Sequence, residues 1–468
     1  MEVAAPDPVW LAMDSRNCLT HSLKHTKAEE LIRNTSRMDN HRTAPHIKVR
    51  LAVMMFLQYA IWGAWLPLLF FYVTSHLQWT PGDFGTIAAL GACGAILGPF
   101  ISGQIADRYF ATERFLAVSH AIGGLLVWSL ASIGPQNYTA FCVLSFFYGL
   151  VYAPTIPLTN SICFHNLKNT EREFGAVRVW GTIGWIVVGI AMGHWLLHVT
   201  TGLAADQVLP VRHAAMADSF KLSAILGWVL AVFCLLLPHT PPRRSAKRTF
   251  APLAAISELR KRSMWVLFLV AFPISVVHQF YFVHTAPFLE VTVNANTEWL
   301  VPLFGAGGVG LMTIGQIGEI VVLACMPFIL RRWSKKNILL LGLLAYITRF
   351  AIFAFVPHSA AIVPALALHG LCFGCFFFVA FIIVDEESGS DVRASAQGLF
   401  NFIVVGVGII AGNLFAGQIG DSAVKPEGGF DYVFLFAVPL AITVASAIAL
   451  LLLYPAKAKA AVTQKVAS

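Results

Sequence analysis

Long apolar runs separated by short polar breaks limit most strongly how this chain can fold. A helix needs about 20 apolar residues to cross the roughly 30 Å hydrocarbon core of a bilayer. Twelve runs of about this length can be marked off, at residues 50–74, 82–105, 113–133, 139–163, 173–197, 217–238, 264–289, 302–329, 337–356, 361–384, 393–418 and 430–454. We therefore predict an all-α integral membrane protein with twelve transmembrane helices.

Composition supports this class of protein and excludes several others. The 468 residues are 57% hydrophobic and only 12% charged, whereas soluble domains average about 25% charged residues. The eight cysteines lie mostly inside apolar runs, where they act as small hydrophobes and imply no disulfide framework. We therefore do not expect a disordered chain, a secreted disulfide scaffold or an ordinary cytosolic enzyme.

Basic residues predict the orientation, because cytoplasmic loops carry an excess of Lys and Arg. They gather in the first 47 residues, in the loop 239–263 and in the short segment 331–336, whereas the loops on the other side hold little beyond Arg212 and Lys425. We expect both termini in the cytoplasm. The net charge of +8 is then a topology signal, and we expect no nucleic-acid partner.

The central loop divides the runs into six and six. We predict a cytoplasmic extension at 1–47, one six-helix bundle at 48–238, a cytoplasmic loop at 239–263, a second bundle at 264–456 and a cytoplasmic tail at 457–468. Short internal repeats, such as Trp185-Ile-Val-Val-Gly189 and Phe402-Ile-Val-Val-Gly406, favour a duplication. Met38 lies shortly before the first run, and translation from this residue is a hypothesis.

Few polar side chains lie within the spans, and these are functional candidates because a charge in the bilayer usually faces a cavity or a partner. Arg178, Thr182 and Trp185 are spaced to share one helix face. Gln316 and Glu319 are three residues apart and also share a face. Two structural alternatives remain: Arg178 could extend to the membrane interface, and Glu319 could only bond neighbouring helices.

Further polar groups could line a cavity. Gln58 shares a face with Trp62 and Trp65, and Asn160 follows two prolines in the run 139–163; Gln279 is a candidate in the run 264–289. The alternatives are helix packing, an interfacial aromatic belt and helix–helix hydrogen bonds. Three histidines are weaker candidates, since buried histidines often only satisfy neighbours: His278, His284 and His369.

Gly103, Asp107 and Arg108 end the second run on the cytoplasmic side. Their spacing resembles the signature that follows the second helix in the major facilitator superfamily, where it belongs to a gate. The basic residues that usually complete that signature are missing, because Tyr109-Phe-Ala-Thr follows. The alternative interpretation is a helix-end cap with an Arg that sets topology.

Together these residues resemble the nucleoside:proton symporters of the major facilitator superfamily, the group of bacterial nucleoside permeases. The matching stretches are Phe56-Leu-Gln-Tyr-Ala-Ile-Trp-Gly-Ala-Trp65, Ala106-Asp-Arg-Tyr109, Pro154-Thr-Ile-Pro-Leu-Thr-Asn160, Val177-Arg-Val-Trp-Gly-Thr-Ile-Gly184, Gln316-Ile-Gly-Glu319 and Arg393-Ala-Ser-Ala-Gln-Gly-Leu-Phe400. The resemblance implies a nucleoside importer of the cell inner membrane, driven by a proton gradient and using no cofactor. The family's polar site residues match Arg178, Gln279, Gln316 and Glu319.

This chain departs from the family at two positions. Phe282 stands one turn after Gln279, where some members carry Asn, and Gly374 stands where the family's tenth helix carries Asp. Both changes remove polar groups suited to ribose hydroxyls and weaken the prediction of nucleoside selectivity.

We expect a monomeric symporter that works by alternating access between its two bundles. In this hypothesis Arg178 and the glutamines, with Gln58, Asn160 and Thr182, bind the substrate, Trp185 stacks on its base and Glu319 carries the proton. A buried carboxyl favours its neutral, protonated form, which suits that role. The alternatives are a symporter for a sugar or another small polar metabolite, and a non-transporting membrane sensor. An enzyme is not expected, because no nucleophile–base pair or metal-ligand spacing stands out.

Overall fold

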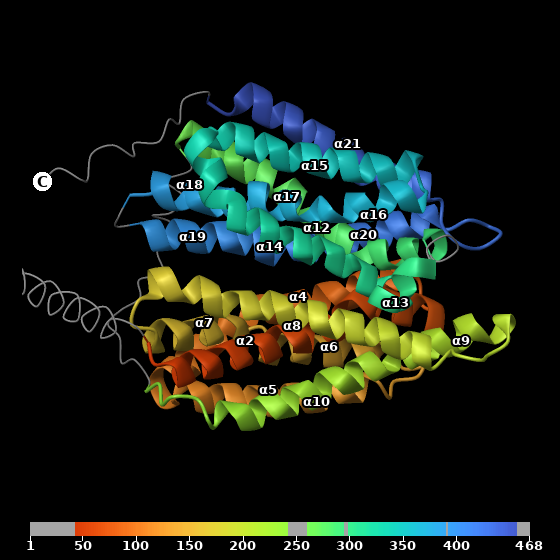
Figure 1. Cartoon of the computed structure of the whole chain (residues 1–468), viewed down its shortest axis with the longest axis horizontal. Coiled ribbons are helices and arrows are strands. Elements are labelled where there is room, and N and C mark those ends of the chain that lie inside the picture. The colour runs from red at the N-terminus through yellow and green to blue at the C-terminus, as the bar shows by residue number, and fades with distance from the viewer. Residues whose placement is uncertain (1–42, 242–259, 294–297, 390–391, 456–468) are drawn as a thin grey trace, which may run out of the picture.

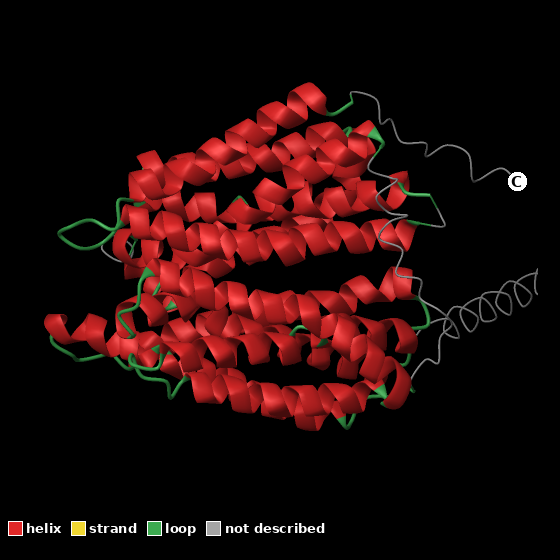
Figure 2. Cartoon of the chain, turned by 180° about the vertical axis from the view of Figure 1, so that it is seen from behind, coloured by secondary structure: helices red, strands yellow, loops and turns green. Residues whose placement is uncertain are grey.

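The computed structural model describes residues 43–241, 260–293, 298–389 and 392–455, except the side chains of residues 95, 98–109, 171, 298 and 394. Its helices form two groups that lie side by side (Figure 1; Figure 2 shows the opposite side). Apart from an isolated bridge between Val424 and Phe430, the described residues contain no β-structure. The prediction of an all-α fold is confirmed.

The N-terminal group comprises the helices before the central loop. They are α2 (Pro45–Trp65), α3 (Leu69–Phe71), α4 (Pro81–Tyr109), α5 (Thr112–Leu130), α6 (Tyr138–Tyr152), α7 (Thr155–Asn166), α8 (Thr170–His198), α9 (Ala205–Ala215) and α10 (Ala217–Cys234). The 3-10 turn η2 (Leu66–Leu68) and the π-helical turn η3 (Tyr72–His76) continue α2 and α3 into one span.

The C-terminal group comprises the helices after that loop. They are α12 (Arg262–Thr292), α13 (Val301–Phe304), α14 (Val309–Arg332), α15 (Lys335–Phe355), α16 (Ser359–Ala367), α17 (His369–Leu371), α18 (Val379–Glu387), α19 (Arg393–Asn401), α20 (Gly408–Ala423) and α21 (Tyr432–Leu453). The turns η4 (Glu298–Leu300), η5 (Cys372–Phe378) and η6 (Phe402–Val407) complete the group, and η5 and η6 are π-helical.

Ten helical segments of the described chain are long and apolar enough to cross a membrane. They correspond to ten of the twelve expected runs. The other two runs coincide with α4 and α5, which are helical but are not among the ten. The count of twelve spans and the five-part domain division therefore remain predictions, and most of the predicted extension, central loop and tail lies outside the described residues.

The eighth expected span begins later than predicted. We expected a helix from residue 302, but α13 ends at Phe304 and α14 starts at Val309. Gly305, Gly307 and Gly308 between them have φ values of 72°, 80° and 71°, a region that residues with a Cβ rarely adopt. Hydropathy does not detect this break, because the glycines lie within an apolar sequence.

Small residues allow helices to approach closely within the N-terminal group. A Cβ on Gly184 of α8 would overlap the carbonyl oxygen of Phe56 on α2, and one on Gly149 of α6 would overlap the backbone of Gly91 on α4. Such contacts are typical of membrane helices, where packing replaces the hydrophobic effect between neighbours.

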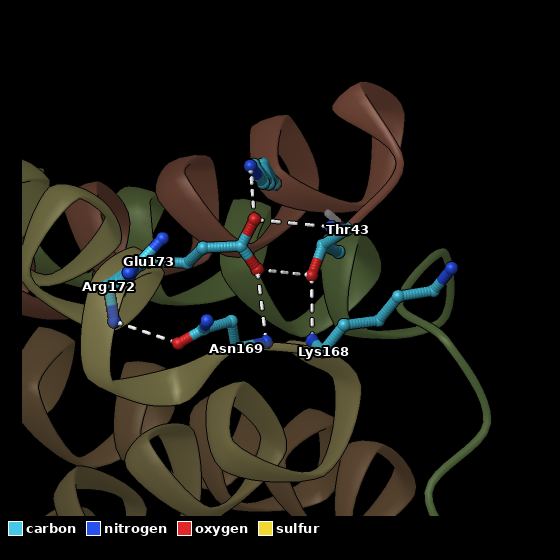
Figure 3. A network of polar contacts seen from close by, with 6 residues as sticks. Thr43, Lys168, Asn169, Arg172 and Glu173 are labelled. Carbon is cyan, nitrogen blue, oxygen red and sulfur yellow. Dashed lines mark hydrogen bonds and ion pairs between the residues drawn. The ribbon is translucent and has the colours of Figure 1, made fainter. Parts of the chain in front are cut away.

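A polar network fastens the start of α2 to the start of α8 (Figure 3). The Glu173 carboxylate accepts hydrogen bonds from the Thr43 amide (3.1 Å), the Thr43 hydroxyl (2.5 Å) and the Asn169 amide (3.4 Å). Lys48 lies 2.5 Å from the same carboxylate, and the Lys168 amide donates to the Thr43 hydroxyl. A carboxylate is favourable at a helix N-terminus. The network therefore fixes two helices that carry site residues.

We call the end of the protein where α2 begins and α21 ends the terminal end, and the opposite end, which carries α9 and α13, the distal end (Figure 1). Polar contacts join the two groups at the distal end. The Gly82 amide donates to Asp421 (3.0 Å) and the Arg212 guanidinium donates to Glu290 (2.9 Å). The Ala306 amide donates to the carbonyl of Gly193 (2.8 Å). The structure is thus held closed at this end.

Candidate functional site

The face of α8 that carries Arg178, Thr182 and Trp185 meets α2. The Arg178 Cζ atom lies 4.0 Å from the ring centroid of Tyr59 on α2. The Trp185 ring lies edge-on to Trp62 of α2, with centroids 5.8 Å apart. Thr182, one turn after Arg178, is half-buried. The guanidinium therefore packs on an aromatic ring between helices, which differs from an extension to the membrane interface.

The C-terminal group places Gln316 and Glu319 on α14, which packs against α8. Gln316 is buried and its Oε1 atom has no hydrogen-bond partner among the described residues. Glu319 is half-buried on the same helix. A cation from the N-terminal group and a carboxyl from the C-terminal group thus stand on two helices that pack against each other.

Aromatic rings continue this site from one group into the other. Trp185 contacts Phe282 of α12 at 6.4 Å between centroids, and Phe282 in turn contacts His278 and His369 at 5.3 Å and 5.5 Å. Phe282 therefore contributes an apolar face where some relatives carry Asn. Gly374 faces Val322, since a Cβ there would lie 2.7 Å from the Val322 side chain. It serves the packing of η5 against α14.

Two of the amide candidates are occupied by contacts within their own group. The Gln58 side chain is fully buried and donates to the Thr155 hydroxyl at 2.7 Å. Gln279 donates to the Asn413 side chain of α20 at 2.9 Å. Asn160 is half-buried, and its Oδ1 atom is buried without a partner in the described chain. The geometry favours helix–helix bonding for Gln58 and leaves Asn160 available.

The two tryptophans of α2 contact different helices. Trp62 faces Trp185, whereas Trp65 is buried against Tyr148 and Phe220 inside the N-terminal group. Gly103, Asp107 and Arg108 lie within α4, but their side chains are outside the described part, so the gating hypothesis stays a prediction.

The histidine candidates are satisfied by neighbours. His284 bonds the carbonyl of Ala416 at 2.9 Å, and His278 bonds the Tyr346 hydroxyl at 2.5 Å. His369 stacks on His278 and accepts a hydrogen bond from Arg349 at 3.2 Å.

Sequence reasoning missed Arg349, which is fully buried in α15. Its guanidinium lies 3.9 Å from the Tyr281 ring and 5.0 Å from the Tyr346 ring. A single charge inside an apolar run was the available signal, the same one that identified Arg178. Sequence reasoning also missed Tyr59, for which no local signal exists, because Phe56 and Trp62 are equally aromatic neighbours.

Comparison with known proteins identifies this arrangement. The sequence model of the family described as Nucleoside H+ symporter matches residues 46–459. The chain belongs to this family. It is therefore a proton-coupled nucleoside transporter of the multi-span membrane class and not an enzyme, which confirms the predicted function.

Individual relatives agree. The chain is 33% identical over 377 residues to the putative nucleoside transporter YegT of Escherichia coli, covering 79% of this chain and 83% of the relative. It is 30% identical over 387 residues to the xanthosine permease of the same organism, covering 80% and 88%. The crystal structure of the nucleoside transporter NupG aligns with a TM-score of 0.75 at 23% identity, covering 88% of this chain and 100% of that one, which shows the shared fold.

Proposed function

We propose that this protein imports nucleosides across the inner membrane together with protons, through a site between its two groups of helices. Arg178 and Gln316 bind the nucleoside, Trp185 and Phe282 contact its base, and Glu319 carries the proton. The observation that supports this site most strongly is the packing of α8, which carries Arg178, against α14, which carries Glu319, beside the aromatic rings of Trp62, Trp185 and Phe282. Thr182 and Asn160 complete the substrate site, whereas Gln58 and Gln279, which were also predicted to bind substrate, bond Thr155 and Asn413 and hold the neighbouring helices in place.

The terminal end faces the cytoplasm in this proposal. Basic residues stand where helices begin at this end: near the start of α2 (Lys48) and at the starts of α12 (Arg262), α15 (Lys335 and Lys336) and α19 (Arg393). Cytoplasmic ends carry such an excess. We propose that the protein acts as a monomer and that the proton gradient drives it without a cofactor.

Glu319→Gln tests the proton role. The amide keeps the size and hydrogen-bonding capacity of a protonated carboxyl but cannot release a proton. In proteoliposomes, the variant should bind labelled uridine and exchange it with uridine inside, yet fail to accumulate it when an inward proton gradient is imposed. Glu427→Gln, an identical change in an exposed distal loop, should accumulate uridine normally.

If Glu319 only bonds neighbouring helices, the glutamine variant will accumulate uridine as the wild type does. That result would exclude the carrier role. Loss of both exchange and accumulation in a folded variant would instead assign Glu319 to substrate binding.

A further inference from the structure

The flat face of the Arg178 guanidinium contacts an aromatic ring, and its N–H groups bond no residue of the described chain. The Tyr59 ring lies 4.0 Å from its Cζ atom, and the described chain offers the guanidinium no hydrogen bond and no ion pair within direct contact. A guanidinium carries five N–H donors in its plane, and stacking on an aromatic face uses none of them. A bidentate carboxylate would use two. Tyr59 thus anchors the cation while all of its donors stay available.

Gly181 makes room for this contact. A Cβ at this position would lie 2.6 Å from Cδ2 of Tyr59 and 2.8 Å from Nη1 of Arg178. Both distances are shorter than real side-chain contacts allow, and so any larger residue would displace the ring or the guanidinium. Gly181 lies between Arg178 and Thr182 on α8 and is buried. The sequence therefore provides a ring on α2 and a gap on α8 that fit one another.

We propose that Tyr59 is a positioning residue for substrate binding. Together with Gly181, it holds Arg178 against α2 with its donors free for a ligand and prevents it from forming a close ion pair with Glu319. The ligand chemistry it serves is a set of carbonyl or hydroxyl oxygens in the plane of the guanidinium, as a nucleoside offers. This inference rests on the proposed site.

Variants at Tyr59 distinguish the contribution of its aromatic face to uridine binding from that of its hydroxyl group. Tyr59→Phe and Tyr59→Trp keep a face and should bind uridine with a Kd within about twofold of wild type, whereas Tyr59→Leu should raise the Kd about five- to thirtyfold. The exchange rate at saturating uridine should change little, because the contact acts on affinity. Phe56→Leu removes a ring from the same helix one turn earlier and should leave the Kd unchanged.

Gly181→Ala should reproduce the Tyr59→Leu defect by displacing the ring. Gly175→Ala is the matched control, because a Cβ at Gly175 on the same helix meets nothing within 4 Å. Wild-type affinity in folded Tyr59→Leu, or equal defects in the Phe and Leu variants, would overturn the proposal.

A substrate-free measurement keeps this test independent of the proposed function. Melting temperatures of Tyr59→Leu, Arg178→Met and the double variant form a cycle that reports the contact itself. Non-additive changes are expected if the ring holds the cation, and additive changes would refute the contact. If the cycle is non-additive but the wild type binds no nucleoside, the proposed substrate fails while the Tyr59–Arg178 contact stands.

Discussion

Removing one partner of the Arg212–Glu290 ion pair should open the distal end of the protein. The two side chains come from opposite groups, α9 and α12, and their charged atoms lie 2.9 Å apart. Only 12% of the Arg212 side chain and 5% of the Glu290 side chain are exposed. The second carboxylate oxygen lies 3.8 Å from His213. The pair can exist only while the groups are together at this end, so it stabilises the closed state alone.

The size of the effect follows from this geometry. A hydrogen bond to a charged group contributes about 1.5–3 kcal/mol, and about 1.4 kcal/mol changes an equilibrium tenfold. Arg212→Met or Glu290→Met should therefore shift the balance toward the distal-open state by roughly 10- to 100-fold. The double variant should shift it less, because no unpaired charge is left in the closed interface.

Spin labels at Gln136 and Ser422 would measure this shift. Both residues are exposed. Gln136 lies in the turn between α5 and α6, and Ser422 lies near the end of α20, next to the Asp421 that bonds Gly82 across the two groups. Pulsed electron spin resonance should show a larger population of long distances in each single variant. Lys221→Met, which breaks the more exposed Lys221–Asp218 pair within α10, should leave the distances unchanged. Unchanged distances in both single variants would refute the assignment of this pair as a distal latch.

Two further changes test the central helices. Arg178→Lys should weaken uridine binding at least tenfold, while the variant still inserts and folds normally. An ammonium group cannot reproduce the planar donors of a guanidinium or stack flat on Tyr59. Near-normal binding would favour the interpretation that Arg178 extends to the membrane interface. Gly184→Ala should lower the free energy of unfolding by about 1–3 kcal/mol, because the added methyl group overlaps the Phe56 carbonyl. A melting assay in detergent would follow this change, and Gly175→Ala should melt as the wild type does.

The sequence predicted the spans because a bilayer requires long apolar helices, and no tertiary contact alters that requirement. It also predicted the stripe on α8, since the spacing of Arg178, Thr182 and Trp185 follows directly from helix geometry. The structure places Arg178 and Trp185 against α2, and it places Trp185 against α12.

Partners across helices could not be predicted in the same way. Trp62 and Trp65 are three residues apart on α2, yet one meets Trp185 of α8 and the other packs against Tyr148 of α6 and Phe220 of α10. Which of them faces the interface depends on how α2 rotates against α8 and α10, and a single sequence does not record that rotation. For the same reason, the sequence does not predict the Tyr59–Arg178 contact or the Gln279–Asn413 hydrogen bond.

On the proposed assignment, the opposite charges of Arg178 and Glu319 would make transport coupled and not merely proton-permeable. With Glu319 ionised and no ligand bound, the charges of the pair cancel, and the empty site can close without a net charge in the membrane. Once Glu319 is protonated, Arg178 is left as an uncompensated cation, which is costly in the low-dielectric interior. A nucleoside that supplies oxygen acceptors to the free donors of Arg178 offsets part of this cost. On the proposed assignment, the protonated site therefore closes readily only when substrate is bound, so that protons and nucleosides cross together.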